Sequence, residues 1–352
     1  MKKILLVDYY GMCDNKGNPI GHSPKVLREY RELIQDDFQV GAALSPCLME
    51  GTEGLFADVI SLKYNINAKG YKSFWERITD KFKLLHNIRQ VMKHKEYDIM
   101  WFYRTDFFLF FSFYMHRKRN GTKMIGQVYQ EEFIGGGLAG LLNHIYKKGA
   151  MKFDGLIYTQ KGMAGFHPNT LYIPDYYYDE EKYGKYRGQV KEEKAVCLGT
   201  MNPYKKLEEV VDAFNQNGMR LEIKGYFYDK ERLGRLLEKK KSNIEIQDVI
   251  LSEEEYYSLL AGAEYSLLPY DMEQYSSRTS GVLQESLFLG AVPVAPRQLL
   301  EENGMDGIGY EKIEELAGRN WMLQEKKKDK QDRLEEYSRE KIRDRLLVFL
   351  EA

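Results

Sequence analysis

The sequence predicts an α/β protein of two domains, each built from a parallel β-sheet with helices on both faces. Short apolar runs alternate with amphipathic stretches along most of the chain, which is typical of parallel sheets joined by helical crossovers. A length of 352 residues is sufficient for two domains of ordinary size. In addition, residues 262–296 contain every part of one strand–loop–helix–strand unit.

The first domain is expected over residues 1–173 and begins with a buried strand at Ile4–Val7. Ser23 and Pro24 predict the start of its first helix, because Ser is a good N-cap and Pro fits the first helical position. Further strands are expected at Phe38–Ala43, Asp58–Leu62, Ile99–Tyr103, Lys123–Tyr129, Gly155–Thr159 and Leu171–Ile173. Further helices are expected over residues 73–94, over residues 107–115 and from about Leu138.

The second domain is expected over residues 174–334, after a polar and aromatic linker that begins at Pro174. Its strands are expected at Ala195–Gly199, Arg220–Lys224, Asn243–Ile246, Tyr265–Leu268 and Val292–Ala295. Its helices are expected over residues 206–215, 229–241, 253–261 and 280–290. A last helix is expected over residues 325–350, where a charged run precedes four apolar residues.

Composition indicates a globular protein of a reducing compartment. The formal net charge of −1 gives no overall bias toward nucleic acid. The widely spaced Cys13, Cys47 and Cys197 form neither a disulfide framework nor a zinc motif, and the histidines lack metal-binding spacing. No window reaches 18 consecutive apolar residues. We therefore expect a cytoplasmic protein, without nucleic acid as a partner and without a metal site.

The aromatic run Phe107–Met115 is followed by the basic residues of His116–Arg119, and it has two interpretations. It can be a buried helix whose basic end satisfies the last carbonyl groups. Alternatively, it can be a patch at the inner face of a membrane, with aromatic rings in the interface and cations on anionic lipid.

The unit at residues 262–296 has the features of an anion-binding site. A strand closes at Pro269, a polar loop follows, and Ser280 with Gly281 opens a helix that ends at Gly290. Backbone amides and the positive helix end meet at this loop, which favours an anionic ligand. Glu285 lies one turn into the helix, where a carboxylate can accept hydrogen bonds from sugar hydroxyls.

This combination resembles the C-terminal nucleotide-sugar site of GT-B fold glycosyltransferases, in particular the retaining family 4 (group 1) type. The family pattern is an apolar strand, Pro, a variable loop, Gly near a helix start, Glu, and then Gly-x-Pro-Val. The matching residues are Leu267–Pro269, Ser280–Val282, Glu285 and Gly290–Val294. The resemblance implies two Rossmann-like domains with parallel sheets facing across a cleft, and a C-terminal helix, at about 335–352, that returns to the N-terminal acceptor domain.

The resemblance also implies an activity. A hexose would pass from a UDP- or GDP-sugar to a hydroxyl of a glycan or lipid-linked acceptor, with retention, in cell-surface polysaccharide biosynthesis. No cofactor is required, although Mg²⁺ could assist. The alternative is a catalytically degenerate GT-B scaffold that binds nucleotide or a protein partner without turnover.

Two residues match the family at the first loop of the second domain. Gly199 and Lys205 stand where the family has a glycine and the lysine that holds the donor diphosphate. Thr200 stands where arginine is usual, and we expect Arg278 to replace that cation. The resemblance therefore assigns Lys205 and Arg278 to the leaving diphosphate; the alternative for Lys205 is an exposed lysine at a helix start.

Further donor contacts follow from the resemblance. Glu285 is the expected ligand of the ribose hydroxyls, or else a plain exposed helix glutamate. Ser277 stands where family 4 often has another glutamate, which favours sugar contacts through Ser277, Thr279 or backbone amides, or through the nearby Asp271 and Glu273. The remaining expected donor-binding residues are Thr200, Val249, which lies at the loop expected near the base, Ser280, Gly281 and Val282.

Acceptor contacts are expected from two loops of the first domain. Gly21 and His22 precede the first helix, and Glu131 and Glu132 follow a later strand. His22 can contact phosphate or acceptor, or it can serve only in capping or packing. Either glutamate can shape the acceptor site or remain an ordinary exposed carboxylate.

Overall fold

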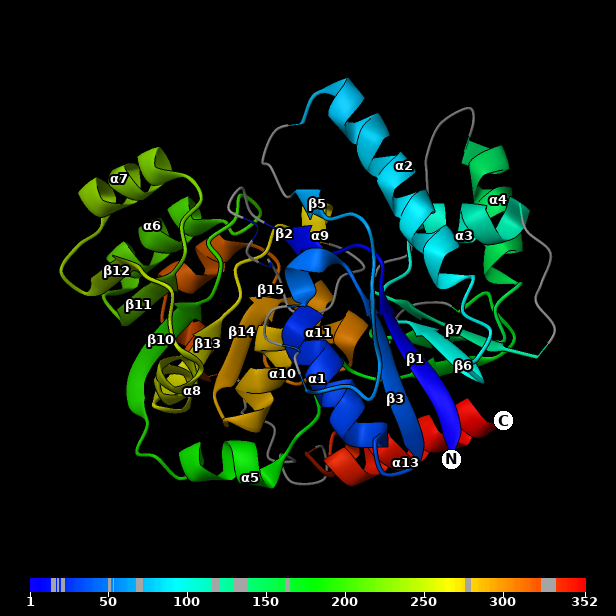
Figure 1. Ribbon diagram of the computed structural model, residues 1–352. Coiled ribbons are helices and arrows are strands. Elements are labelled where there is room, and N and C mark those ends of the chain that lie inside the picture. Colours follow the sequence, from blue (N-terminus) through cyan, green and yellow to red (C-terminus); the bar gives the residue numbers. More distant parts are fainter. Residues whose placement is uncertain are drawn as a thin grey trace. The chain divides into compact units, whose positions relative to one another are not determined.

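The structure is a computed structural model that describes residues 1–13, 17, 19, 23–49, 52, 54–67, 72–115, 121–129, 139–161, 165–275, 280–323 and 334–352. The chain divides into two compact units (Figure 1). The first contains Met1–Thr159, Met163–Pro174 and Arg343–Ala352, and the second contains Gln160–Gly162 and Asp175–Ile342.

The sheet of the first unit has seven parallel strands in the order β4-β3-β1-β6-β7-β8-β9. They are β1 (Lys2–Asp8), β3 (Phe38–Leu44), β4 (Val59–Ser61), β6 (Ile99–Phe102), β7 (Lys123–Val128), β8 (Gly155–Tyr158) and β9 (Thr170–Tyr172). A small parallel pair, β2 (Met12–Cys13) and β5 (Ile66–Asn67), is separate from this sheet. The inner strands are buried along nearly their whole length, as expected where helices cover both faces.

The helices of the first unit are α1 (Ser23–Ile34), α2 (Phe74–Val91), α3 (Phe107–Met115) and α4 (Ala139–Ala150), with the short η1 (Pro46–Leu48). The C-terminal helix α13 (Arg339–Glu351) belongs to this unit from Arg343 onward. Lys123 is the first residue of β7, and its ammonium donates to the carbonyl oxygens of Phe349 and Leu350 at 2.7 and 3.1 Å. These bonds satisfy carbonyl groups that a helix C-terminus leaves open.

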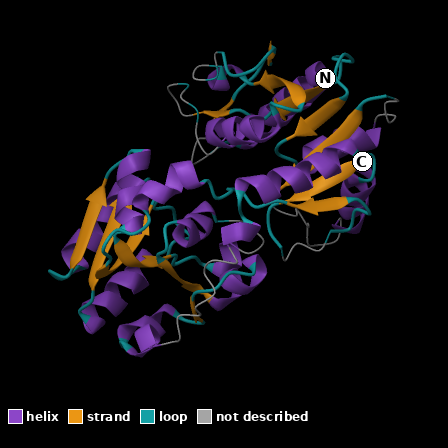
Figure 2. Cartoon of the chain, turned by 90° about the horizontal axis from the view of Figure 1, so that it is seen from below, coloured by secondary structure: helices purple, strands orange, loops and turns teal. Residues whose placement is uncertain are grey.

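The sheet of the second unit has six parallel strands in the order β12-β11-β10-β13-β14-β15. They are β10 (Glu192–Leu198), β11 (Arg220–Gly225), β12 (Ile244–Asp248), β13 (Ala263–Leu267), β14 (Val292–Pro296) and β15 (Ile308–Tyr310). Helices lie on both sides of the sheet in each unit (Figure 2). The predicted fold class of two parallel-sheet α/β domains is therefore confirmed.

The helices of the second unit are α5 (Glu180–Tyr183), α6 (Leu207–Asn217), α7 (Lys230–Lys239), α8 (Glu253–Ala261), α9 (Met272–Tyr275), α10 (Gly281–Phe288) and α11 (Arg297–Asn303), with η2 (Gly184–Tyr186), η3 (Ile313–Ala317) and η4 (Asn320–Leu323). Helix α8 begins at a capping box between Ser252 and Glu255, in which each residue's side chain accepts a hydrogen bond from the other's amide. Helix α6 ends at Gly218, whose φ of 67° is readily adopted by glycine.

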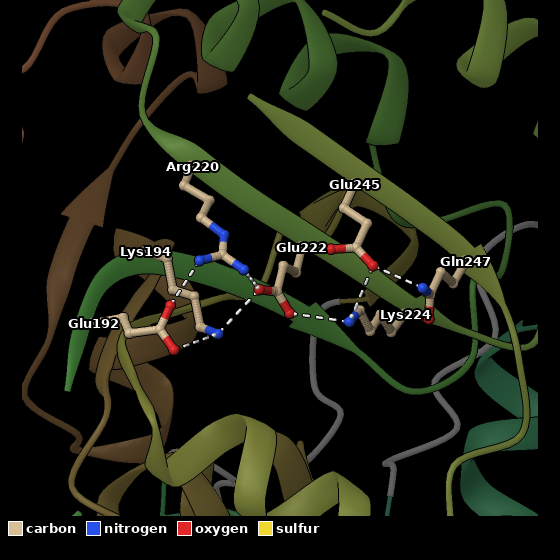
Figure 3. A network of polar contacts seen from close by, with 7 residues as sticks. All are labelled: Glu192, Lys194, Arg220, Glu222, Lys224, Glu245 and Gln247. Atoms are coloured by element: carbon tan, nitrogen blue, oxygen red, sulfur yellow. Dashed lines mark hydrogen bonds and ion pairs between the residues drawn. The ribbon is translucent and has the colours of Figure 1, made fainter. Parts of the chain in front are cut away.

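Alternating residues of β10, β11 and β12 place a ladder of charges on one face of the second sheet (Figure 3). Leu221 and Ile223 belong to the apolar core, so the intervening Glu222 points to the opposite face. The Glu222 carboxylate is buried and contacts the ammonium groups of Lys194 at 2.9 Å and Lys224 at 3.2 Å. Each buried charge on this face is thus matched by an opposite charge.

The predicted last helix over residues 325–350 is wrong in being continuous. The part of it at residues 325–333 lies outside the described residues, residues 334–336 are helical, and after an interruption at 337–338 the helix α13 begins at Arg339. Just before it, the Tyr178 amide donates to the Tyr337 carbonyl, and the Arg339 amide donates to the Tyr178 carbonyl. This strand-like pairing with a distant segment interrupts the helix, and a charge pattern cannot reveal it.

Candidate functional site

The candidate site lies at the point of the second sheet where the strand order reverses. Strands β10 and β13 are neighbours in the sheet although β11 and β12 lie between them in the sequence, and those two strands lie on the other side of β10. In doubly wound sheets, ligands bind outside the carboxyl ends of the strands at such a reversal. The loops after β10 and β13, which contain most of the residues predicted from sequence, both start at this edge.

These two loops are joined by backbone hydrogen bonds. The Lys206 amide donates to the Pro269 carbonyl at 2.8 Å, and the Asp271 amide donates to the Tyr204 carbonyl at 2.8 Å. Lys205 and Tyr270 form an isolated antiparallel bridge between them. The two predicted segments, more than sixty positions apart in the sequence, therefore form one local structure.

Gly199 is required by the backbone conformation at the start of the first loop. Its φ is +90°, a conformation that residues with a Cβ rarely adopt. A Cβ added to Gly225, at the end of β11, would lie 1.6 Å from the Gly199 carbonyl oxygen. The loops after β10 and β11 therefore approach each other as closely as bare backbone allows, and Thr200 is left exposed beside them.

Lys205 is buried, with 4% of its surface exposed, and its ammonium donates to the Leu198 carbonyl at 2.8 Å. This position excludes the alternative of an exposed lysine at a helix start. The ammonium lies at the carboxyl end of β10, and it has three N–H groups to donate. By contrast, Lys206 is half-buried and pairs with the Asp271 carboxylate at 3.3 Å.

Arg232 of α7 holds the first loop in place. Its guanidinium donates to the carbonyls of Asn202 at 3.0 Å and Lys205 at 2.6 Å. It also forms a two-pronged ion pair with the Glu208 carboxylate at 2.8 and 2.5 Å. Burial alone would raise the pKa of Glu208, but the hydrogen bond from Arg232 is the larger influence and lowers it. Arg232 cannot be recognised from the sequence, because nothing in a highly charged helix indicates which partner an arginine will contact.

Glu285 is buried in α10 rather than exposed, with 5% of its surface accessible. The Tyr256 hydroxyl, on α8, donates to one of its carboxylate oxygens at 2.9 Å. The Tyr257 hydroxyl lies 3.4 Å from the other oxygen and shares its hydrogen with the Glu253 carboxylate, which is nearer at 2.7 Å. Burial, and then the nearby Glu285 charge, raise the pKa of Tyr256 well above its ordinary value. Both tyrosines therefore remain donors at neutral pH. The sequence analysis missed them, although a Tyr-Tyr pair on the preceding helix was visible.

The start of α10 has an N-cap residue that does not cap. Ser280 is buried, but its side chain makes no capping hydrogen bond, and its hydroxyl lies 3.4 Å from that of Tyr270. The first amides of the helix, including those of Gly281 and Val282, thus donate no hydrogen bond to the Ser280 side chain. A Cβ on Gly281 would lie 2.2 Å from the Tyr176 ring, so this position requires glycine for close packing.

Two further features complete this edge of the sheet. The rings of Tyr270 and Tyr275 stack in parallel with centroids 3.9 Å apart, which holds these two residues of the second loop together. The half-buried Val249 donates its amide to the Gly225 carbonyl at 3.0 Å, so the loop after β12 adjoins the loop after β11. Val249 therefore lies at the same edge as the other predicted donor-binding residues.

The remaining predicted site residues lie outside the described part of the chain. They are Gly21, His22, Glu131, Glu132, Ser277, Arg278 and Thr279. Within the described residues, no group of three or more His, Cys, Asp or Glu side chains could hold a metal ion. The roles of the seven predicted residues outside the described part of the chain stay predictions.

No protein-family model matches the chain, and no curated protein matches it. Solved structures of glycosyltransferases do. HepE from Anabaena in complex with UDP matches with a TM-score of 0.64 at 13% identity, over 99% of each chain. An α,α-trehalose-phosphate synthase from Burkholderia xenovorans in complex with glucose-6-phosphate matches with a TM-score of 0.64 at 12% identity, over 99% of this chain and 100% of that one.

A third match is sucrose-phosphate synthase from Thermosynechococcus elongatus, with a TM-score of 0.62 at 13% identity, over 99% of this chain and 95% of that one. These likenesses extend over nearly the full length of both chains. At such low identity they show the fold, which is the two-domain GT-B architecture.

Proposed function

We propose that this protein is a glycosyltransferase that moves a hexose from a UDP- or GDP-sugar to a hydroxyl of a glycan or lipid-linked acceptor. The observation that carries the proposal is the construction of the edge between β10 and β13. The loops after these two strands are joined there by backbone hydrogen bonds. Beside them, helix α10 begins without a capping hydrogen bond from the Ser280 side chain. The buried Glu285 carboxylate of the same helix is contacted by the hydroxyls of Tyr256 and Tyr257.

In the proposed reaction, the acceptor oxygen bonds to the anomeric carbon while the bond from that carbon to the diphosphate oxygen breaks. The acceptor proton passes to the departing phosphate oxygen, and the configuration is retained. Lys205, Arg278 and the amides at the start of α10 stabilise the charge that grows on the diphosphate. Glu285 accepts hydrogen bonds from the ribose hydroxyls, and its tyrosine donors fix its orientation.

The family 4 subtype, the role in cell-surface polysaccharide biosynthesis and assistance by Mg²⁺ belong to the same proposal. Their support is the match of Gly199, Lys205 and Glu285 to the family pattern. Retention can be checked by NMR of the anomeric proton in the product. Loss of activity on addition of EDTA, and its recovery with Mg²⁺, would show that the metal assists.

The first experiment measures binding of UDP, GDP and their hexose derivatives by calorimetry. We expect one nucleoside diphosphate to bind, and Glu285→Gln to weaken it about tenfold, because a charge-assisted hydrogen bond is lost. Glu231→Gln, an exposed residue of the first turn of α7, is the matched control and should bind normally. Absence of binding by every nucleotide would overturn the proposal.

The second experiment separates an enzyme from a degenerate scaffold. With a donor identified, donor hydrolysis and transfer to acceptor mixtures are followed for the normal chain and for Lys205→Met. An enzyme should lose about 10²-fold in rate when a group that stabilises the leaving charge is removed. Nucleotide binding without turnover on any acceptor, and without donor hydrolysis, would support the scaffold instead.

A further inference from the structure

Large apolar side chains are exposed along one side of α2. Phe74, Trp75 and Phe82 have 70%, 73% and 69% of their surfaces accessible. Phe74 and Phe82 are two helical turns apart with the half-buried Ile78 between them, and Trp75 lies on the same side as Phe82. We name Phe74, Trp75, Ile78 and Phe82 the α2 strip. Single exposed apolar residues are ordinary, but a contiguous strip indicates an interaction surface.

The α2 strip stands on a firmly anchored helix. The opposite face of α2 buries Leu84, Ile88 and Val91 in the core of the first unit. The amide of Asn87, also fully buried, donates to the carbonyls of Tyr9 at 3.0 Å and Tyr64 at 2.8 Å. In Figure 1, α2 lies beside α3 and its amino-terminal half extends past that helix. The α2 strip therefore lies on the outer face of a helix that is packed into the core of the first unit.

The acidic residues of α2 are already engaged. Glu76 completes the capping box with Ser73, and Asp80 pairs with the ammonium groups of Lys72 at 2.6 Å and Lys83 at 3.4 Å. Neither carboxylate therefore offsets the cations beside the strip.

Three cations of α2 remain without an acidic partner. Among the described residues, Arg77, Lys81 and Arg89 take part in no ion pair, and the Lys81 ammonium lies 4.1 Å from the centre of the Phe108 ring. Helix α2 thus carries exposed aromatic rings together with cations that have no carboxylate partner among the described residues, and of these cations Arg77 and Arg89 are exposed.

We propose that the α2 strip and its three cations form a docking surface for an anionic lipid bilayer. Aromatic and aliphatic side chains flanked by Lys and Arg are the composition of helices that lie in a membrane interface. Each cation near an anionic surface adds an attraction that corresponds to about a fivefold gain in affinity. The cations complement an anionic surface, and the exposed rings of Phe74, Trp75 and Phe82 favour a lipid surface over an acidic protein, because they can enter the boundary between headgroups and acyl chains.

For residues 107–119 the sequence allows either a buried helix with a basic end or a membrane patch, and the structure favours the buried helix. Helix α3 buries Leu109, Phe110 and Phe113, and residues 116–120 lie outside the described part of the chain. With the proposed function, on which this step rests, docking through α2 would bring the enzyme to an acceptor that is carried on lipid.

Trp75 is an intrinsic reporter for the test. The chain has three tryptophans, and the other two, Trp101 and Trp321, are buried with 0% and 4% exposure. The full-length protein, without nucleotide, is mixed with vesicles of phosphatidylcholine alone or with about one-third phosphatidylglycerol. We expect a blue shift of the emission and protection from acrylamide with the anionic vesicles, and loss of both at high salt.

Substitutions separate the two parts of the surface. Phe74→Ser with Phe82→Ser should weaken vesicle binding about tenfold or more, because two large apolar groups no longer enter the interface. Arg77→Gln with Lys81→Gln and Arg89→Gln should abolish the preference for anionic lipid, about 10²-fold for three cations. Val348→Ser, another exposed apolar position of the first unit, is the matched control and should bind normally.

Three outcomes would overturn the proposal. One is unchanged Trp75 emission with both kinds of vesicle. Another is vesicle binding that the Phe74 and Phe82 substitutions leave intact. The third is a blue shift without lipid that grows with protein concentration, which would assign the strip to contact between protein copies. Because nucleotide is absent, failure here leaves the proposed sugar transfer untouched, and failure of nucleotide binding leaves this result untouched.

Discussion

Helices α2 and α7 both contain many charged residues, but they differ in how many of their cations form ion pairs within the protein. On α7, three of the four cations form ion pairs: Arg232 with Glu208, Lys230 with Asp248, and Lys239 with Asp212. On α2, one of the four cations, Lys83, pairs with Asp80, while Arg77, Lys81 and Arg89 form no ion pair among the described residues. The cations of α7 mostly stabilise the protein itself, whereas the exposed cations of α2 are available to a ligand outside the chain.

The largest effect on stability is expected at the close contact between Gly225 and the Gly199 carbonyl, at the start of the first loop. Gly225→Ala should destabilise the second unit by about 3 kcal/mol, because the new Cβ would collide with the Gly199 carbonyl. Gly234→Ala, within α7 and with nothing within 4 Å of the new Cβ, should instead stabilise by about 0.5–1 kcal/mol. Urea unfolding measures both; equal effects would contradict the predicted difference.

The second prediction sets one arginine of each helix against the other. Arg232→Gln should cost about 2 kcal/mol, because Glu208 and the carbonyls of Asn202 and Lys205 lose their donor. The pair is partly accessible at Glu208, which keeps the cost below that of a fully buried pair. Arg77→Gln on α2 should change stability by less than about 0.5 kcal/mol. Thermal unfolding of both variants decides the comparison, and a larger loss for Arg77→Gln would refute it.

The third prediction tests charge matching in the second unit through pH. Burial raises the pKa of Glu222, but the hydrogen bonds from Lys194 and Lys224 outweigh burial and lower it below the ordinary 4.5. A lowered folded-state pKa stabilises above the unfolded-state pKa, and this stabilisation is lost as pH falls through the folded-state value. The stability advantage over Glu222→Gln should therefore be constant above about pH 5 and shrink below pH 4.5. An advantage that grew on acidification would contradict the lowered pKa.

The smallest effect is expected on α2. Trp75→Ser should leave the free energy of unfolding within about 0.5 kcal/mol of the normal chain, because the ring is exposed and buries little on folding. Unfolding should be followed by far-ultraviolet circular dichroism, since the substitution removes the exposed fluorophore. A loss of 2 kcal/mol or more, together with normal vesicle binding, would mean that the ring packs within the protein.

The sequence alone determined the fold class and the location of the candidate site. Alternating apolar and amphipathic stretches indicated parallel sheets, because this periodicity is a local property of neighbouring residues. Pro269, Gly281, Glu285 and Gly290 identified the loop and helix of the site, since turn, cap and packing constraints act over a few positions. The resemblance to GT-B glycosyltransferases depended on the same short segments, and the fold agrees with it.

Only the tertiary structure decided which side chains meet. Arg232 contacts the first loop, and Tyr256 contacts Glu285, across 27 and 29 positions of the sequence. The contact of Lys205 with the Leu198 carbonyl spans only seven positions, but its burial depends on the segments packed around it. The same holds for α2, where burial of Leu84 and Ile88 fixes which side faces outward. Local patterns specify the elements, but the partners of a charge or a ring depend on how strands and helices from distant parts of the chain pack together.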